Sequence, residues 1–133
     1  MANEAVLKIE THIPINYTCS TEVTIEKGAI CKKTNPMTAV LSNGINDIVA
    51  GIVQSEKLAA ETTQDSVAIF KGGFFMVKCS GTGSTGDPVV TAGTENTIFV
   101  AETNMENILG VMEEDFTDGQ TKLMWIHPTT MQL

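Results

Sequence analysis

Apolar and polar residues alternate along most of this chain with a period near two, the spacing typical of half-buried β-strands. Val67 and Ile69 follow this spacing, and so do Phe74 and Met76. The segment Lys71–Gly73 between the two pairs is rich in glycine, so the pattern predicts a β-hairpin there. Short strands separated by turns predict an all-β fold.

Helical spacing is confined to one short segment. Ser55–Glu61 has good helix formers after a serine that can cap a helix, and it predicts a single helical turn. Lys122–Ile126, by contrast, is apolar at almost every position and predicts a strand buried on both faces, with Trp125 in the core.

Two halves of the chain resemble each other. Gly86 lies 58 residues after Gly28, and Gly110 lies 59 residues after Gly51, each pair in a similar strand context. Ser80–Gly86 is rich in glycine and threonine and is interpreted as the linker between the halves. Two duplicated strand-turn-strand units can close on each other and remove exposed edges, which predicts a small barrel or sandwich. Chance similarity between short strands is the alternative explanation.

The expected domain organisation follows from this duplication. Residues 1–20 have no counterpart in the second half and are predicted to form an extended N-terminal arm. Residues 21–133 are predicted to form a single β-domain, with half-units at about 21–80 and 81–128. Pro14 cannot donate a ladder hydrogen bond, which favours an arm or an edge strand.

The arm carries apolar residues that need a surface to pack on, either its own barrel or a partner. The candidate contact residues are Ile9, His12, Ile13, Pro14, Ile15 and Tyr17.

Composition narrows the possible functions. The 133 residues include 16 Asp and Glu against 8 Lys and Arg, a net charge of −8, which argues against nucleic-acid binding. Only 18% of residues are charged, and threonine is the common surface residue instead. Without a signal-like N-terminus or a membrane-length apolar run, we expect synthesis in a cytoplasm and no membrane association. The scattered cysteines Cys19, Cys31 and Cys79 are expected to be reduced, buried thiols.

We find no sequence pattern that indicates catalysis or a cofactor. His12 and His127 have no carboxylate at a metal-ligand spacing, and Gly81–Gly86 lacks the lysine of a phosphate-binding loop. The acidic run Glu113–Asp118 lacks the spacing of a calcium loop and is interpreted as a solvated hairpin loop. We therefore expect a protein that is not an enzyme, with no metal, cofactor or small-molecule substrate.

The order of several short motifs resembles a known family. The motifs are Glu26–Lys32, Ile48–Val53, Gly72–Val77, Thr85–Val90 and Ile108–Val111. Together they are similar to the small head-decoration, or capsid cement, proteins of tailed bacteriophages.

The resemblance covers roughly residues 22–128, with departures. Ala29 stands where an acidic residue is common in that family, and Leu58–Thr63 replaces an alanine-rich turn. The departures affect the subgroup more than the class.

The resemblance implies a β-barrel or β-tulip-like domain that forms a homotrimer. Such proteins sit on the outer surface of the virion, at three-fold and quasi-three-fold positions of an icosahedral head. There they bind the major capsid protein, often through the N-terminal arm, and stabilise the capsid. Deletion of residues 1–17 is then expected to leave a folded protein that no longer binds heads.

Two other functions stay open from the sequence. A tail or baseplate adaptor can use the same small β-fold. A surface-displayed carbohydrate-binding module would need exposed aromatic residues, and aromatic residues make up only 5% of this chain.

Overall fold

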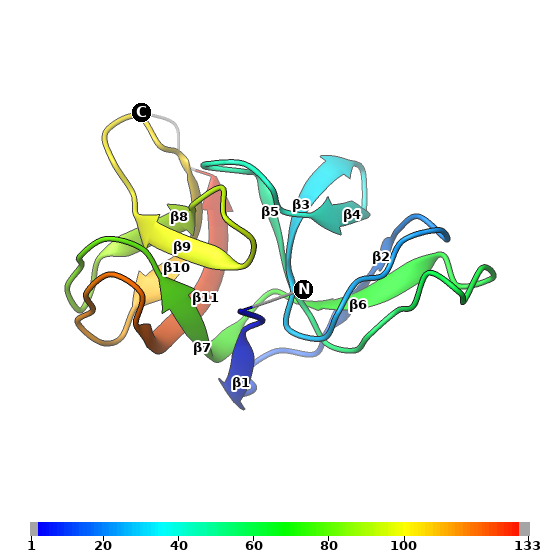
Figure 1. The fold of residues 1–133 in the computed structure, drawn as a ribbon, viewed down its shortest axis with the longest axis horizontal. Helices are drawn as coiled ribbons and strands as arrows, with labels where there is room; N and C mark the ends of the chain where they lie inside the picture. Colours follow the sequence, from blue (N-terminus) through cyan, green and yellow to red (C-terminus); the bar gives the residue numbers. More distant parts are fainter. Residues whose placement is uncertain (1–2, 131–133) are drawn as a thin grey trace.

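The computed structural model describes residues 3–130, and its regular structure there is β-strand throughout. Figure 1 shows two lobes side by side, with the N-terminal strand below their junction. The strands, in chain order, are β1 (Val6–Ile9), β2 (Ile15–Thr18), β3 (Ile30–Asn35), β4 (Thr38–Leu41), β5 (Val49–Val53), β6 (Ser66–Phe70), β7 (Gly73–Cys79), β8 (Pro88–Thr91), β9 (Thr97–Val100), β10 (Asn107–Met112) and β11 (Thr121–Thr130).

Each lobe is a closed five-stranded barrel. The first barrel has the order β2-β4-β3-β5-β6, and it closes because β2 pairs with both β4 and β6. The second barrel has the order β7-β9-β8-β10-β11, and it closes because β7 pairs with both β9 and β11. The prediction of an all-β fold built from small barrels is confirmed.

The two barrels are repeats of one topology. In each, the first strand runs parallel to the third and antiparallel to the fifth. Gly28 and Gly86 precede equivalent strands and have φ angles of +86° and +91°, which glycine adopts without steric cost. The predicted duplication is confirmed, but the units close separately instead of closing on each other.

The junction between the barrels lies at residues 71 and 72. The predicted hairpin around Lys71–Gly73 is wrong, because β6 pairs with β2 and β5, whereas β7 pairs with β1, β9 and β11. Ser80–Gly86 connects β7 to β8. Both strands belong to the second barrel, so this segment does not link the two halves. A period of two identifies a strand but does not identify its partner.

The predicted helical turn at Ser55–Glu61 is also wrong. This segment forms turns around an isolated β-bridge between Lys57 and Ile25. The second barrel has an equivalent bridge between Phe116 and Gly83. Lys57 therefore occupies the place in the first barrel that Phe116 occupies in the second.

The cores of the two barrels meet. Phe70 at the end of β6 lies edge-on against Phe75 of β7, with ring centroids 5.6 Å apart and an interplanar angle of 64°. β5 packs against β10 and β11. The buried backbone amide of Ile30 donates a hydrogen bond to Asn96 Oδ1 at 2.9 Å. The contact between the barrels is therefore apolar at its centre, and a buried hydrogen bond helps to set how the barrels are oriented.

The loop at residues 42–48 adds a polar clasp between the barrels. Thr91 Oγ1 on β8 accepts a hydrogen bond from the Asp47 amide at 2.9 Å and donates one to the Gly44 carbonyl at 2.8 Å. Asn46 Oδ1 accepts a hydrogen bond from the Asn107 amide at 3.0 Å. The shape of this loop thus helps to fix one barrel against the other.

The Asp47 carboxylate holds the clasp loop in shape. Its Oδ2 accepts hydrogen bonds from Ser42 Oγ, Asn43 N and Gly44 N at 2.8, 3.1 and 2.9 Å. Burial alone would raise the pKa of this carboxyl. The hydrogen bonds, with that of Gly44 foremost, and the charge of Lys32 outweigh burial and keep the pKa below 3.8.

We expect Asp47→Asn to lower the free energy of unfolding at pH 7 by about 1–2 kcal/mol, because a charged acceptor is lost. The folded-state pKa lies below the unfolded one, so this stabilisation is complete above the unfolded pKa. It is lost as the pH falls through the folded pKa. Urea unfolding of both proteins between pH 7 and pH 2 measures the difference, which should shrink below about pH 4. A difference that does not depend on pH would contradict this role.

Candidate interaction surfaces

The N-terminal strand β1 is added to the outside of the second barrel. Val6 pairs with Met76 and Leu7 with Phe75, along the part of β7 that β9 leaves uncovered. Leu7 packs against the core, whereas the Val6 side chain is 53% exposed. The strand therefore has one face buried on its own barrel and one face open.

The end of β1 and the segment after it form the most exposed apolar part of the arm. Ile9 is 54% exposed and Ile13 is 85% exposed. The exposed ring of His12 packs over Gly72, and its Nδ1 lies 2.8 Å from Thr11 Oγ1. Pro14 is half-buried.

The last two candidate residues belong to the first barrel. Ile15 and Tyr17 lie on β2, where they pair with Ile69 and Val67. Tyr17 is buried, and its hydroxyl accepts a hydrogen bond from Lys71 Nζ at 2.8 Å. Ile15 is 44% exposed.

The candidate residues therefore fall into different environments. Of the six, Tyr17 is part of the barrel core and cannot reach a partner, whereas Ile9, His12, Ile13 and Ile15 are accessible. Deleting residues 1–17 would remove most of β2 and open the first barrel, so point substitutions are the appropriate test of the arm.

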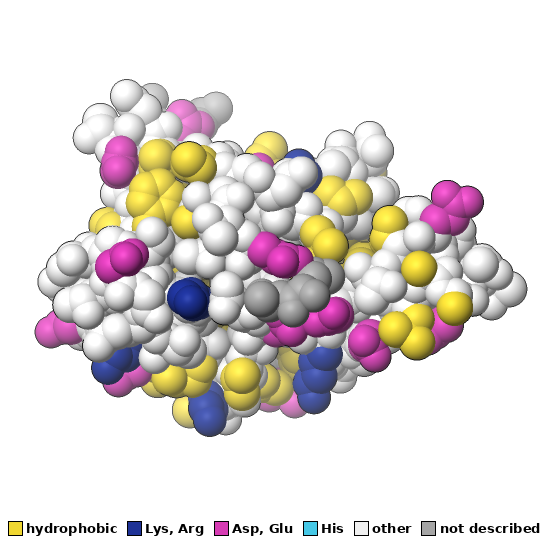
Figure 2. Space-filling view, in the orientation of Figure 1, with side chains coloured by type: hydrophobic (Ala, Val, Ile, Leu, Met, Phe, Trp, Pro, Cys, Tyr) yellow, Lys and Arg dark blue, Asp and Glu magenta, His cyan; other side chains and the backbone are white. Residues whose placement is uncertain are grey.

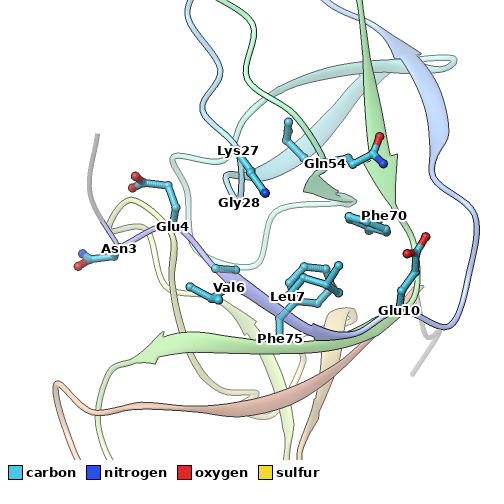
Figure 3. A pocket seen from close by; sticks show the side chains of 12 residues that line it. Asn3, Glu4, Val6, Leu7, Glu10, Lys27, Gly28, Gln54, Phe70 and Phe75 are labelled. Atoms are coloured by element: carbon cyan, nitrogen blue, oxygen red, sulfur yellow. The ribbon is translucent and has the colours of Figure 1, made fainter.

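A cavity of about 720 Å³ lies between β1 and the first barrel. Figure 3 shows Leu7, Phe70 and Phe75 close together on one side, with charged and amide groups around them. Partial burial raises the pKa of the Glu4 carboxyl, and its hydrogen bond to Glu26 raises the pKa further. An apolar floor with a polar rim suits a peptide or side chain of a partner. The lining residues are Asn3, Glu4, Ala5, Val6, Leu7, Glu10, Lys27, Gly28, Val53, Gln54, Phe70 and Phe75.

A second surface, which the sequence did not predict, lies on the outside of the second barrel. We call it the outer face of the second barrel. Two cross-strand rows of apolar side chains form it, since paired residues share a face. The first row runs from Val6 through Met76 to Leu123, and the second consists of Ile9, Phe74, Trp125 and Val111.

Trp125 lies at the centre of the outer face. It is half-buried rather than part of the core, and its ring stacks on that of His127 at 4.8 Å with an interplanar angle of 17°. Figure 2 shows apolar side chains along the lower edge of the second lobe, below β7 and β11. Buried Met124 and Ile126 alternate with half-buried Leu123 and Trp125, which places the latter two on the outside of the barrel. The sequence carries no signal for this, because the whole segment is apolar.

Residues 3–130 show few other groupings of metal-binding or reactive side chains. Between residues 3 and 130, no three His, Cys, Asp or Glu side chains gather as metal ligands would, and no helix is present that could cross a membrane. Cys19, Cys31 and Cys79 are buried and unpaired as disulfides. Burial raises the pKa of Cys31 to about 12 and that of Cys79 to about 11, so both are thiols at neutral pH.

Comparison with known proteins identifies a structural neighbour. No protein-family model matches the sequence, and no curated protein sequence matches it. The crystal structure of the N base of head fiber gp8.5 from bacteriophage phi29 superposes with a TM-score of 0.56 at 12% identity. The superposition covers 90% of this chain and 99% of that one. The fold of this chain is therefore also the fold of a bacteriophage head-fiber base.

Proposed function

We propose that this chain is a structural protein of a tailed-phage virion. It binds the major capsid protein on the outer surface of an icosahedral head, as trimers at three-fold and quasi-three-fold positions, and it stabilises the capsid. The proposal assigns the chain no catalysis and no cofactor.

The observation that carries the proposal is the shared fold. The likeness to the phi29 head-fiber base extends over nearly the whole of both chains and includes both barrels. The motif order within residues 22–128 points separately to head-decoration proteins. Two different kinds of comparison thus support a protein of the phage head.

The exposed arm residues supply a means of attachment. Ile13 presents a large, 85% exposed apolar side chain to solvent, and burying it against a capsid subunit would contribute about 1.5–3 kcal/mol. Three linked copies on a symmetric site engage at high effective concentration, so modest single contacts give firm attachment.

We expect the variant Ile13→Glu to fold normally and to bind heads at least tenfold more weakly. The glutamate would have to be desolvated at the contact, whereas it costs little on the free segment, where Ile13 is 85% exposed. Cosedimentation with expanded heads assembled without this chain measures the binding.

Leu58→Glu is the matched control, because Leu58 is a 42% exposed apolar residue outside the arm. It should bind heads as the unchanged protein does. Equal binding by the arm variant would remove the arm from the proposal. Failure of the unchanged protein to bind heads would overturn the proposal itself, and binding to tails or to glycans alone would support an adaptor or a carbohydrate-binding module instead.

A further inference from the structure

The internal repeat makes positions in one barrel equivalent to positions in the other. Ile52 pairs with Phe70 as Val111 pairs with Trp125, so Phe70 is equivalent to Trp125. By the same registers, Ile69 is equivalent to Met124. Ile15 pairs with Ile69 and Phe75 pairs with Met124, so Ile15 is equivalent to Phe75.

Within the chain, one such pair of positions forms the contact between barrels. Phe70 of the first barrel lies against Phe75 of the second, and the two side chains are 4% and 1% exposed. Ile52, beside Phe70, is fully buried in the same cluster. The first barrel thus offers an outward-facing aromatic residue, and the second barrel receives it.

The complementary pair of positions has no contact of this kind within the described residues. Trp125, the equivalent of Phe70, is half-buried and lies on the outer face of the second barrel. Ile15, the equivalent of Phe75, is 44% exposed on the first barrel. Val111, the equivalent of the fully buried Ile52, is only half-buried. One chain therefore has a surface around Trp125 and a surface around Ile15 that no equivalent contact covers within the described residues. We call the Trp125 surface the donor surface and the Ile15 surface the acceptor surface.

The first barrel shows which residues this fold places on a solvated face. On the outside of the first barrel, Asn16 pairs with Ala68. This pair is equivalent to the pair of Met76 and Leu123 in the second barrel. The second barrel thus has large apolar residues where the first has a polar and a small residue. Adjoining apolar side chains that are left partly exposed on one face are typical of an interaction site.

We propose that copies of this chain join head to tail, with Trp125 of one copy against Ile15 of the next. The contact repeats between chains the packing of Phe70 on Phe75 within the chain. Such a contact is heterologous, and it closes into a ring when the rotation between copies allows it. This inference rests on the self-association part of the proposed function and assigns its surfaces.

Charge restricts where a second copy can approach. A net charge of −8 makes two copies repel each other at most orientations. The two apolar rows of the outer face contain no carboxylate, and Lys78 follows Met76 on the same side of β7. The one carboxylate recorded against the rows is that of Glu114, whose Oε2 accepts a hydrogen bond from the Leu123 amide at 2.8 Å. Two acidic chains can approach most closely where one of them presents this face.

Complementation between two blocked variants tests the inference. Ile15→Glu removes the acceptor surface and keeps Trp125, whereas Trp125→Glu removes the donor surface and keeps Ile15. We expect the unchanged protein to form a closed oligomer and each variant to stay at one chain mass of 14.2 kDa. An equimolar mixture of the variants should give a dimer, because one intact surface of each kind remains. Sedimentation velocity measures all four samples.

Several controls keep the result decisive. Circular dichroism verifies folding, and Val111→Lys replaces Trp125→Glu if that variant does not fold. Leu58→Glu should keep the mass of the unchanged protein. A monomeric unchanged protein, a variant that keeps the oligomer, or a mixture that stays monomeric would each overturn the inference. An oligomer that binds no heads would overturn the proposed function and leave this contact standing.

Discussion

Replacing Lys57 by alanine is expected to lower the free energy of unfolding by about 3–5 kcal/mol. The Lys57 side chain is fully buried at one end of the first barrel. Its ammonium donates hydrogen bonds to the carbonyl oxygens of Thr21, Val23 and Leu58 at 3.0, 2.9 and 3.1 Å. Alanine would leave these carbonyls without their donor and would leave space where the lysine stem packs. Urea unfolding followed by circular dichroism measures the loss.

Two further variants identify the cause of that loss. Lys57→Met keeps most of the stem volume but not the ammonium, so it should lose less than alanine and still more than about 1.5 kcal/mol. Lys33→Ala removes an exposed lysine from the same barrel and should change stability by less than about 0.5 kcal/mol. If methionine were as stable as lysine, the hydrogen bonds of the ammonium would not be what stabilises this end of the barrel.

Gly51→Ala and Gly110→Ala are each expected to destabilise the protein by about 3 kcal/mol, the upper end of the range for overpacked sites. A Cβ at Gly51 would collide with the carbonyl oxygen of Phe70 and lie 2.6 Å from Ile69 Cγ2. A Cβ at Gly110 would collide with the carbonyl oxygen of Trp125. The two collisions occur at equivalent positions, where the fourth strand of each barrel pairs with the fifth.

Gly119→Ala provides the matched control. Gly119 has a φ of +84°, but no atom lies within 4 Å of the added Cβ, so only the backbone preference is lost. The expected cost is about 1–2 kcal/mol. Thermal unfolding of the three variants should therefore rank Gly119→Ala as the most stable. The reverse ranking would show that strand contact is not what requires glycine at positions 51 and 110.

The sequence predicted the class of fold and its duplication because glycines leave a periodic trace. Gly28 and Gly86 have positive φ angles, and Gly51 and Gly110 lie against a neighbouring strand, so each repeat has glycine at the same two positions. Closure into two barrels was not predictable, because it depends on parallel pairing between β2 and β4 and between β7 and β9. Those pairs join residues about twenty positions apart and have no local signature.

The errors at individual residues have a common cause. Lys57 is a good helix former in an exposed-looking segment, but a bridge to Ile25 and three carbonyl acceptors determine its conformation. Trp125 lies in an apolar run, and only the buried neighbours on either side show that it faces outward. Among the arm residues, Tyr17 reads like Ile13 in the sequence, yet one completes a barrel and the other lies in solvent. In each case the sequence does not show which strand, distant along the chain, lies beside the residue.

The chain has a single tryptophan, and that residue lies on the outer face of the second barrel. Its indole is half-buried in one copy, and an apolar cover over it would exclude water from the ring. The emission maximum of the unlabelled protein should therefore move to shorter wavelength whenever copies join through this face, and should not move when a head binds through Ile13 alone. Intrinsic fluorescence can thus follow assembly and head attachment as separate events in one sample.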